Sequence, residues 1–386
     1  MSAPKTKQTV HRTPTKPSAP VKKRSLTPNK KTSAGRTGYS QARGYEPKRI
    51  IVTLSACAVV LVLGCTGYAL YQHFSASASS STTSSTSLTS VVDNLGSKSS
   101  LVLSSGNYTL SNFSDSLGGT YDGVLIPTSL QSFTGAGIDK SVIKMNTNSS
   151  TQSSKVPTAS GTTNQLFLIY FRTGTTSIGN FTLAGSTQGH LYNGMMLNTI
   201  SSPKITNVKV TSVPGSSNSP PGETFGIDDF KTTNAVYDNV EVNGSSVGAS
   251  GLGVNNSSNV TINNSYFHGN SHAMGVTFWK TAGASLTNVR SMSNSTAFNF
   301  EMDTGTFTLK SPTFGSSSSG HDINIGSDSA SIKLTIHDPT ISNGQSKIRI
   351  NLPSKYHGAT NSQKKSDIHV YVGSSDKTSS LVQWLP

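Results

Sequence analysis

The chain has 386 residues and a formal net charge of +14, which would favour a nucleic-acid partner if a folded surface carried that charge. Residues 1–49 hold 13 of the 31 Lys and Arg residues and only one acid, Glu46, so most of the excess belongs to this tail. The rest of the chain is nearly neutral, and we expect no nucleic-acid partner for it. Both cysteines, Cys57 and Cys65, lie in an apolar segment, which excludes a disulfide scaffold further along.

The first 49 residues are rich in Lys, Arg, Pro, Ser and Thr and contain almost no large aliphatic side chains. Such a segment cannot bury enough apolar surface to offset the entropy of ordering it. The sequence therefore predicts a disordered basic tail. Its charge either sets the membrane topology and stays solvated, or attracts anionic lipid or nucleic acid beside the membrane.

Residues 50–71 form an uncharged apolar run that is long enough to cross a bilayer as one helix. Lys48 and Arg49 precede the run, and no Lys or Arg follows it until Lys98. Because basic residues stay on the cytoplasmic side, the sequence predicts a single-pass plasma-membrane protein in contact with the lipid bilayer, with a cytoplasmic N-terminus and an extracellular C-terminal domain. The alternative is lipoprotein processing at Cys65, and the apolar run continues past that residue, which favours an uncleaved anchor.

Residues 72–90 are mostly Ser, Thr and Ala, a composition typical of a flexible stalk. From residue 91 to 386 the chain is rich in Gly, Asn, Ser and Thr, and it shows short apolar runs without helical periodicity. Both features indicate an all-β extracellular domain.

Short alternating apolar segments recur along this domain with a period of about 25 residues, which is typical of one coil of a parallel β-helix, a solenoid. The first residues of these segments are Phe167, Met195, Ile227, Leu252, Val276, Phe298, Ile323 and Ile348. Because coils stack about 4.8 Å apart, each inward column becomes an apolar stripe.

A column of asparagines supports this register. Asn207, Asn239, Asn264 and Asn288 each follow the start of an apolar segment by the same number of residues. Asparagine tolerates the left-handed backbone region, and its side-chain amide can bond to a stacked neighbour. We therefore predict an asparagine ladder at a turn.

Three early stretches resemble the N-terminal coils of the pectin-lyase-like superfamily of right-handed parallel β-helices. They are Ser105–Leu110, Val124–Pro127 and Phe133–Ile143, and the resemblance covers about residues 91–351. It implies a right-handed parallel β-helix. It does not imply one activity, because these folds host hydrolases, lyases, epimerases, adhesins and viral tailspikes.

Asp229 is the one polar member of an otherwise apolar column. Either its carboxyl points inward with a raised pKa, or the strand bulges and turns it outward beside Asp228. The segment Gly226–Phe230 also resembles the paired-aspartate motif of polygalacturonases, which are inverting hydrolases. The positions where that family carries further motif residues, Leu197–Thr199 and Gly251–Gly253, hold no acid or histidine here.

The outward positions beside this strand suggest a sugar-binding platform. Trp279 would stack on a sugar ring, Asn255 and Asn299 would donate hydrogen bonds, and Glu301 would complete the substrate-binding set. An aromatic side chain, acids and amides on one flat face are what a polysaccharide or cell-surface glycan needs.

Asp228 and Asp229 are the candidate catalytic acid and base, with Glu223 as a third candidate. Glu301 lies three coils from Asp228, or about 14 Å, which exceeds the roughly 6.5–9.5 Å of an inverting pair. We expect no cofactor and no metal, since a calcium-dependent lyase would need acids on several adjacent coils. Two functions stay open: a membrane-anchored hydrolase or lyase acting on polysaccharide, and a non-catalytic glycan-binding or adhesion module.

Overall fold

The computed structural model describes residues 85–110, 112–114, 120–144, 156–158, 161–163, 166–185, 192–212, 224–244, 249–270, 273–315, 317–326, 331–342, 344–353 and 367–385. They belong to one compact unit, Ser81–Pro386. The predicted tail, membrane span and most of the stalk lie outside the described residues, as does Glu223. No helix within the described part is long and apolar enough to cross a membrane.

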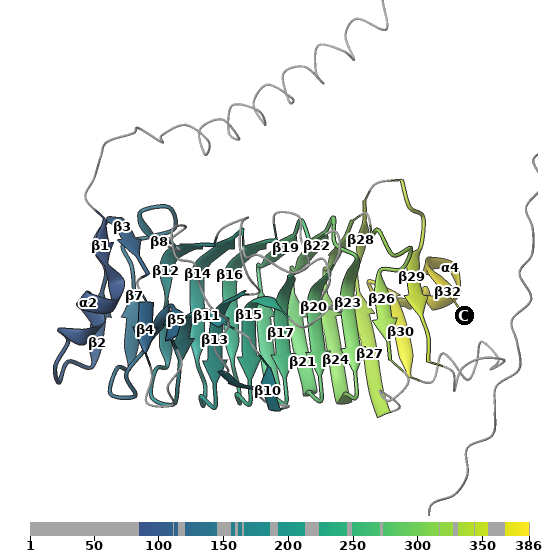
Figure 1. Ribbon diagram of the computed structural model, residues 1–386. Helices are drawn as coiled ribbons and strands as arrows, with labels where there is room; N and C mark the ends of the chain where they lie inside the picture. Colours follow the sequence, from purple (N-terminus) through teal and green to yellow (C-terminus); the bar gives the residue numbers. More distant parts are fainter. Residues whose placement is uncertain are drawn as a thin grey trace, which may run out of the picture. The chain divides into compact units, whose positions relative to one another are not determined.

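Two long sheets run along the domain, and successive coils contribute strands to both (Figure 1). The ten-stranded sheet consists of β6 (Val124–Leu125), β11 (Leu166–Phe171), β13 (Tyr192–Asn198), β15 (Phe225–Phe230), β17 (Ser250–Asn255), β20 (Met274–Trp279), β23 (Thr296–Glu301), β26 (Ile323–Ile325), β29 (Ile348–Asn351) and β32 (Val382–Leu385).

The eighteen-stranded sheet forms the remaining wall of the coils. Its strands are β1 (Thr86–Ser87), β2 (Ser100–Val102), β3 (Gly106–Thr109), β7 (Ser132–Thr134), β8 (Ser141–Lys144), β12 (Ser177–Ala184), β14 (Lys204–Thr211), β16 (Val236–Asn243), β18 (Ser258–Asn263), β19 (Tyr266–His268), β21 (Ala282–Thr287), β22 (Arg290–Met292), β24 (Thr304–Lys310), β25 (Thr313–Phe314), β27 (Ser331–His337), β28 (Thr340–Ile341), β30 (Ile368–Val372) and β31 (Ser375–Asp376). Two short hairpins, β4 (Asn112–Ser114) with β5 (Thr120–Asp122) and β9 (Val156–Thr158) with β10 (Gly161–Thr163), complete the described strands.

The pairing in the ten-stranded sheet is parallel and follows the predicted period. Ile227 pairs with Met195 in the preceding coil and with Leu252 in the next, and the same column continues through Val276 to Phe298. A parallel β-helix is therefore confirmed by strand register, and its right-handed sense stays a prediction.

The predicted register is wrong by two residues at both ends of this column. Met195 pairs with Ile169 rather than Phe167, and Ile323 pairs with Ile350 rather than Ile348. Strand β11 is almost continuously apolar, so alternation alone could not fix its register. Strand β29 offers two inward isoleucines, and either one satisfied the pattern.

The interior is a continuous apolar core with stacked aromatic rings. Phe278 and Phe300 lie in adjacent coils with their ring centroids 5.2 Å apart and nearly parallel planes. Phe307, from the opposite sheet, meets both rings edge-on at 5.2 and 5.0 Å. All three side chains are fully buried, and each such ring contributes about 1.5–3 kcal/mol of hydrophobic stabilisation.

The asparagine ladder is present at a corner of the eighteen-stranded sheet. Its members adopt the left-handed conformation, with φ between 48° and 60°. Asn239 donates to Asn207 at 2.8 Å, and Asn207 donates to Asn180, which extends the ladder by one coil. Asn288 donates to Asn264, whereas Asn264 donates to Asp238, so the ladder is broken at that one step.

Gly226 interrupts the inward–outward alternation of β15. A Cβ atom at Gly226 would lie 2.3 Å from the buried Val242 side chain, so this residue faces inward like its neighbour Ile227. The pairing of β15 with β17 keeps one register across this point, from Phe225–Ser250 to Ile227–Leu252. Alternation then resumes with Asp228 outward and Asp229 inward.

A short α-helix lies near each end of the described β-helix. At the N-terminal end, helix α2 (Leu88–Asp93) begins after the N-cap Ser87 and buries Leu88 and Val92 in the core. The folded part thus includes residues 88–90, which the sequence analysis gave to the stalk. At the C-terminal end lie the β30–β31 hairpin and helix α4 (Thr378–Leu381).

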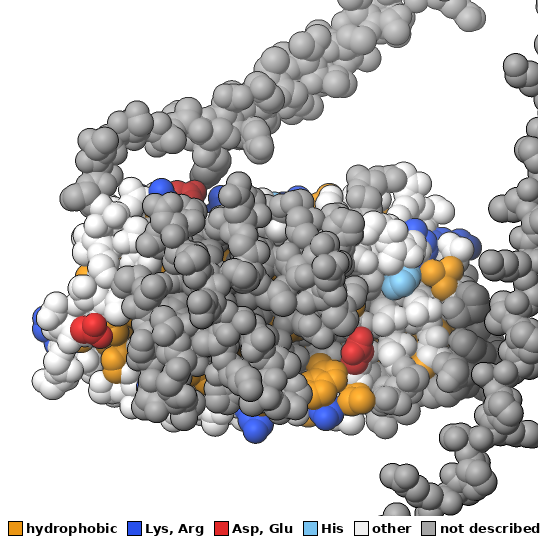
Figure 2. Space-filling view, in the orientation of Figure 1, with side chains coloured by type: hydrophobic (Ala, Val, Ile, Leu, Met, Phe, Trp, Pro, Cys, Tyr) orange, Lys and Arg blue, Asp and Glu red, His pale blue; other side chains and the backbone are white. Residues whose placement is uncertain are grey.

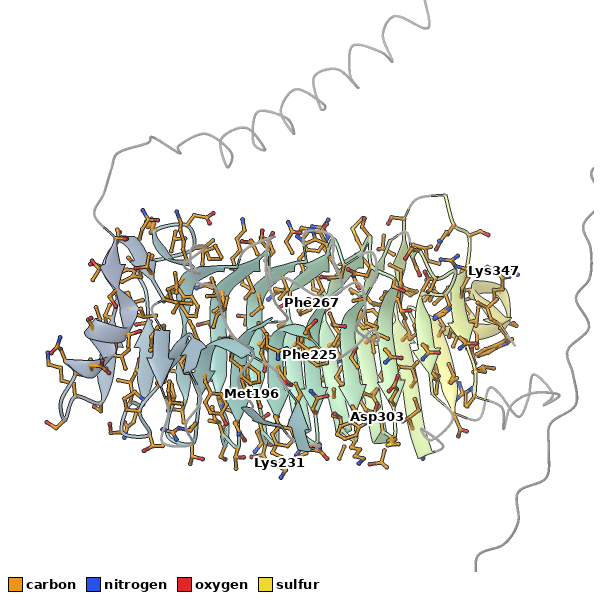
Figure 3. The ribbon with its side chains drawn as sticks, in the orientation of Figure 1. Met196, Phe225, Lys231, Phe267, Asp303 and Lys347 are labelled. Atoms are coloured by element: carbon orange, nitrogen blue, oxygen red, sulfur yellow. The ribbon has the colours of Figure 1, made fainter. Side chains whose placement is uncertain are left out.

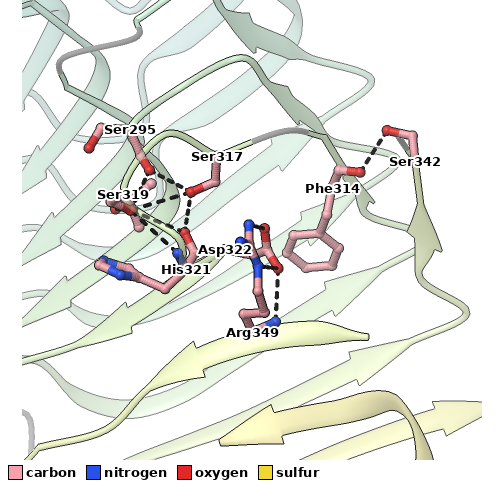
Figure 4. Close-up of polar contacts among 9 residues, drawn as sticks. Ser295, Phe314, Ser317, Ser319, His321, Asp322, Ser342 and Arg349 are labelled. Atoms are coloured by element: carbon pink, nitrogen blue, oxygen red, sulfur yellow. Dashed lines mark hydrogen bonds and ion pairs between the residues drawn. The ribbon is translucent and has the colours of Figure 1, made fainter. Parts of the chain in front are cut away.

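A buried ion pair joins two of the last coils. Asp322 is fully buried just before β26, and it accepts hydrogen bonds from the backbone and the guanidinium of Arg349 in β29 (Figure 4). The serines of the preceding loop, Ser317 and Ser319, bond to backbone carbonyls nearby. These contacts hold the C-terminal coils together, and the Asp322 carboxylate has a structural role as the partner of Arg349.

Candidate functional site

Asp229 lies inside the helix and is fully buried. Its carboxylate accepts hydrogen bonds from three hydroxyls: Thr232 in the adjoining corner, Tyr237 in β16 at 2.8 Å, and Ser257 of the next coil at 3.0 Å. Burial raises the pKa of Asp229 to about 6, and the three hydroxyl donors offset part of that rise. A carboxylate in this position cannot contact a polysaccharide, so a direct catalytic role for Asp229 finds no support in the geometry.

Asp228 is the outward member of the pair. Its side chain is 6% exposed and accepts a hydrogen bond of 2.6 Å from the Asn255 amide. Burial raises the pKa of Asp228 to about 7, the Asn255 hydrogen bond works against that rise, and the negative charge of Asp229 adds to it. The carboxyl therefore exchanges its proton near neutral pH, which is what a general acid or base requires.

Two features beside Asp228 give the site its shape. Gly253 pairs with Asp228 in the next coil, and Thr277 pairs with Gly253 in the coil after that. The Thr277 hydroxyl is buried and has no hydrogen-bond partner among the residues that the structure describes. The ring of Phe225, labelled in Figure 3, lies where a Cβ atom of Gly253 would stand 2.6 Å from two ring carbons.

These neighbours were only partly visible in the sequence. The predicted register places Thr277 on the outer face, but nothing in the pattern shows that its hydroxyl lacks a partner. The sequence likewise shows a glycine at 253 and a phenylalanine at 225, without showing that the ring of one lies over the backbone of the other.

The residues predicted to form a sugar platform lie near one another, and most of their polar groups already have partners within the protein. Asn255, Trp279 and Glu301 occupy one outward row in three adjacent coils. The Lys280 ammonium lies 4.2 Å from the Trp279 ring centroid, so a cation–π contact occupies one face of that ring. Asn299 is buried and donates to Glu301 at 3.0 Å.

An aromatic group flanks Asp228 on the opposite side. Phe167, Met196 and Phe230 form a buried cluster on the outer face, and Tyr170 packs against it. The Phe167 and Tyr170 rings stack with centroids 5.7 Å apart. Asp228 thus lies between an apolar cluster from its own and the two preceding coils and the residues Asn255, Trp279 and Glu301 of the following ones.

In the view of Figure 2, the charged side chains of the described residues are scattered rather than gathered into one patch. Asp303, at the corner after β23, has its pKa raised by burial to about 8, but its oxygens accept the backbone N–H groups of Thr281 and Glu301. Within the described part of the chain, no group of three or more His, Cys, Asp or Glu side chains could hold a metal ion.

A second polar cluster lies on the outer face of the eighteen-stranded sheet. Glu241 accepts a hydrogen bond from His268 at 3.1 Å and lies 3.9 Å from Lys209, and these two contacts help to hold its pKa below the usual range. His268 stacks on Tyr266, whose ring is covered by Arg290. These side chains are hydrogen-bonded, paired or stacked with one another across neighbouring coils, so their contacts stabilise the stacking of those coils.

Comparison with known proteins gives only weak similarities. No family model matches the chain, and no curated protein matches it. Among solved structures, an endo-xylogalacturonan hydrolase from Aspergillus tubingensis matches at 11% identity and a TM-score of 0.39, covering 77% of this chain and 91% of that one. A family 28 exopolygalacturonase of Yersinia enterocolitica matches at 9% and 0.35, covering 77% and 73%.

A third match is the A-module of a mannuronan C-5 epimerase from Azotobacter vinelandii, at 13% identity and a TM-score of 0.30, covering 76% of this chain and 91% of that one. At TM-scores this low these matches assign neither an activity nor a superfamily, and the fold rests on the strand register described above.

Proposed function

We propose that the domain binds a polysaccharide along the outer face of the ten-stranded sheet and acts on it with Asp228 as general acid or base. The observation that carries this proposal is the state of Asp228: an outward, nearly buried carboxyl with a pKa of about 7 and one amide donor, Asn255. General acid–base catalysis is most efficient when the pKa lies near the working pH.

The reaction is either hydrolysis or elimination, and the two differ in the partner they need. An inverting hydrolase needs a second carboxyl roughly 6.5–9.5 Å from the first. Glu301 is three coils away, about 14 Å, so within the proposal this role falls to Glu223 in the sequence segment before β15. A lyase needs one base and a proton donor for the leaving group.

The test is a glycan array on the full chain, followed by product analysis on every polysaccharide that binds. Asp228→Asn keeps the side-chain volume and should lower turnover by about 10²–10⁴-fold while affinity changes little. Asp338→Asn is the matched control, because it makes the same change at an exposed corner remote in sequence. Equal turnover in the two variants would exclude Asp228 as the catalytic group.

A non-catalytic glycan-binding module is the second candidate function. It is favoured by the scarcity of carboxyls on the described outer face, where Asp228 and Glu301 lie three coils apart. In that case no variant shows turnover, and Trp279→Ala weakens glycan binding because the exposed part of the indole ring is the stacking surface.

We further propose that residues 50–71 anchor the domain to the outer side of the plasma membrane, as the charge asymmetry of the sequence indicates. Protease added to intact cells should then release the domain and spare residues 1–49. Recovery of the domain in a protected, intracellular form would contradict this topology.

A further inference from the structure

Phe225 is an unusual buried aromatic side chain. Only 5% of it is exposed, yet it belongs to neither of the two hydrophobic clusters formed by the described residues. Its backbone N–H is held by the Asn193 side-chain oxygen at 2.5 Å, while its ring lies over the backbone of Gly253. Among the described residues, the ring therefore joins no apolar cluster of the kind that normally holds a phenylalanine in place.

The ring fills the space left by the missing side chain of Gly253, which we call the Gly253 depression. Its neighbours in the sheet are polar, because Gly253 pairs with Asp228 in the coil before it and with Thr277 in the coil after it. Asn255, two residues along the same strand, donates to Asp228. A phenyl ring offers Thr277 no conventional hydrogen-bond partner, and the buried hydroxyl has no partner among the described residues.

A buried unpartnered hydroxyl is unfavourable in a folded protein unless something else compensates for it. A sugar ring is about as large as a phenyl ring and carries hydroxyls at its edge. It would fill the same depression and offer hydrogen bonds to Thr277 and to the Asp228 carboxyl.

We propose that Phe225 is a plug: its ring occupies the Gly253 depression in the free protein and swings away when one pyranose unit of a polysaccharide takes its place. The proposal rests on the proposed function and adds a substrate class to it. The side chains that line the depression among the described residues are a carboxyl, an amide and a hydroxyl. This chemistry recognises the hydroxyl edge of a neutral sugar rather than a carboxylate.

A plug lowers the apparent affinity, because the ligand binds only the fraction of molecules in which the depression is open. Removing the ring abolishes this competition. Phe225→Ala should therefore tighten binding of a matching oligosaccharide by about tenfold or more. Gly253→Ala would place a methyl group in the depression itself, so it should clash with the ring when Phe225 is present and block the sugar when Phe225 is absent.

The experiment uses the full chain and four hexasaccharides: cellohexaose, xylohexaose, an α-1,3-glucan hexamer and a galacturonate hexamer. Calorimetry compares their binding to wild type, Phe225→Ala, Phe225→Leu and the double variant Phe225→Ala/Gly253→Ala. We expect a neutral hexasaccharide to bind more tightly to Phe225→Ala, and the double variant to lose that gain. Phe225→Leu, which keeps apolar volume, serves if the alanine variant does not fold.

Unchanged or weaker binding to the folded Phe225 variants, with wild type still binding, would overturn the plug and leave the role of Asp228 intact. Tighter binding of the galacturonate hexamer alone would overturn the neutral-sugar assignment. Conversely, tighter binding to Phe225→Ala together with full turnover in Asp228→Asn would support the plug and reject the catalytic role. If none of the proteins binds or cleaves any carbohydrate, the plug and the proposed function fail together.

Discussion

Strand β15 places two neighbouring aspartates on opposite faces of one sheet, and their surroundings differ in kind. Asp229 is the more deeply buried, yet its pKa rises only to about 6, because three hydroxyls donate to it. Asp228 has one amide donor, and its pKa rises to about 7. Burial alone therefore does not identify a catalytic carboxyl. The number of donors already committed to it separates the structural aspartate from the reactive one.

The largest expected loss of stability comes from the inner face of the ten-stranded sheet, and it can be compared with a substitution on the outer face. Phe300→Ala removes a fully buried ring that contacts Phe278 and Phe307, and it should lower the free energy of unfolding by about 3–5 kcal/mol. Trp279→Ala, on the outer face of the neighbouring coil, should cost less because the indole is only half-buried. Urea unfolding of both variants measures the difference. Equal losses would mean that the outer face is packed like the core.

Truncating each aspartate in turn tests the comparison directly. Asp229→Ala leaves the Thr232, Tyr237 and Ser257 hydroxyls without their acceptor, and we expect a loss of about 1–3 kcal/mol in unfolding free energy. Asp228→Ala removes a single hydrogen bond and should cost less. Chemical denaturation at one pH gives both values. A larger loss at Asp228 would reverse the roles assigned here.

The pH dependence of stability follows from the same carboxyls. Asp228, Asp229 and Asp303 have pKa values raised from 3.8 to about 7, 6 and 8, so the folded state binds more protons than the unfolded state between these limits. The free energy of unfolding should therefore fall as pH rises from about 4 to about 8. In Asp228→Asn the fall should be shallower up to about pH 7. A stability that rises over this range in wild type would contradict the assigned shifts.

The smallest effect is the loss of one hydrogen bond from the asparagine ladder, as in Asn239→Gly. Asn239→Gly keeps the left-handed backbone without strain but removes the bond to Asn207, and should cost about 0.5–1.5 kcal/mol. Asn239→Ala should cost about 1–2 kcal/mol more, because alanine is strained in that conformation. Thermal or urea unfolding resolves the pair. Equal stability of the two variants would show that the backbone relaxes at this corner.

The repeat could be predicted because each coil of a solenoid places apolar residues at equivalent positions, and these recur along the sequence. The column from Met195 to Ile323 recurs at steps of 22 to 32 residues, the asparagine corner follows it at a constant offset of 12, and the structure has both. The end coils were misplaced where apolar residues at Phe167 and Ile348 lie near equivalent inward positions. Spacing alone cannot choose between two apolar candidates in one strand.

The site was less predictable, since its decisive contacts join distant parts of the chain. The sequence left open whether Asp229 faced inward or was turned outward by a bulge, and the structure places it inward with an unshifted register. The stacking of coils brings the hydroxyl donors to Asp229 and the ring of Phe225 to Gly253. No local sequence motif predicts these contacts. The amides expected to bind sugar, Asn255 and Asn299, proved to be engaged with neighbouring carboxyls for the same reason.

The most direct test of the central claim is a carboxyl NMR titration of the selectively labelled chain, with and without a bound oligosaccharide. Asp228→Asn identifies the outer resonance by its loss. The account predicts that this resonance titrates with a midpoint near pH 7. It also predicts that binding of the oligosaccharide shifts this resonance and leaves the Asp229 resonance unchanged. An Asp228 carboxyl that titrates near pH 4, or one that does not respond to a bound sugar, would contradict it.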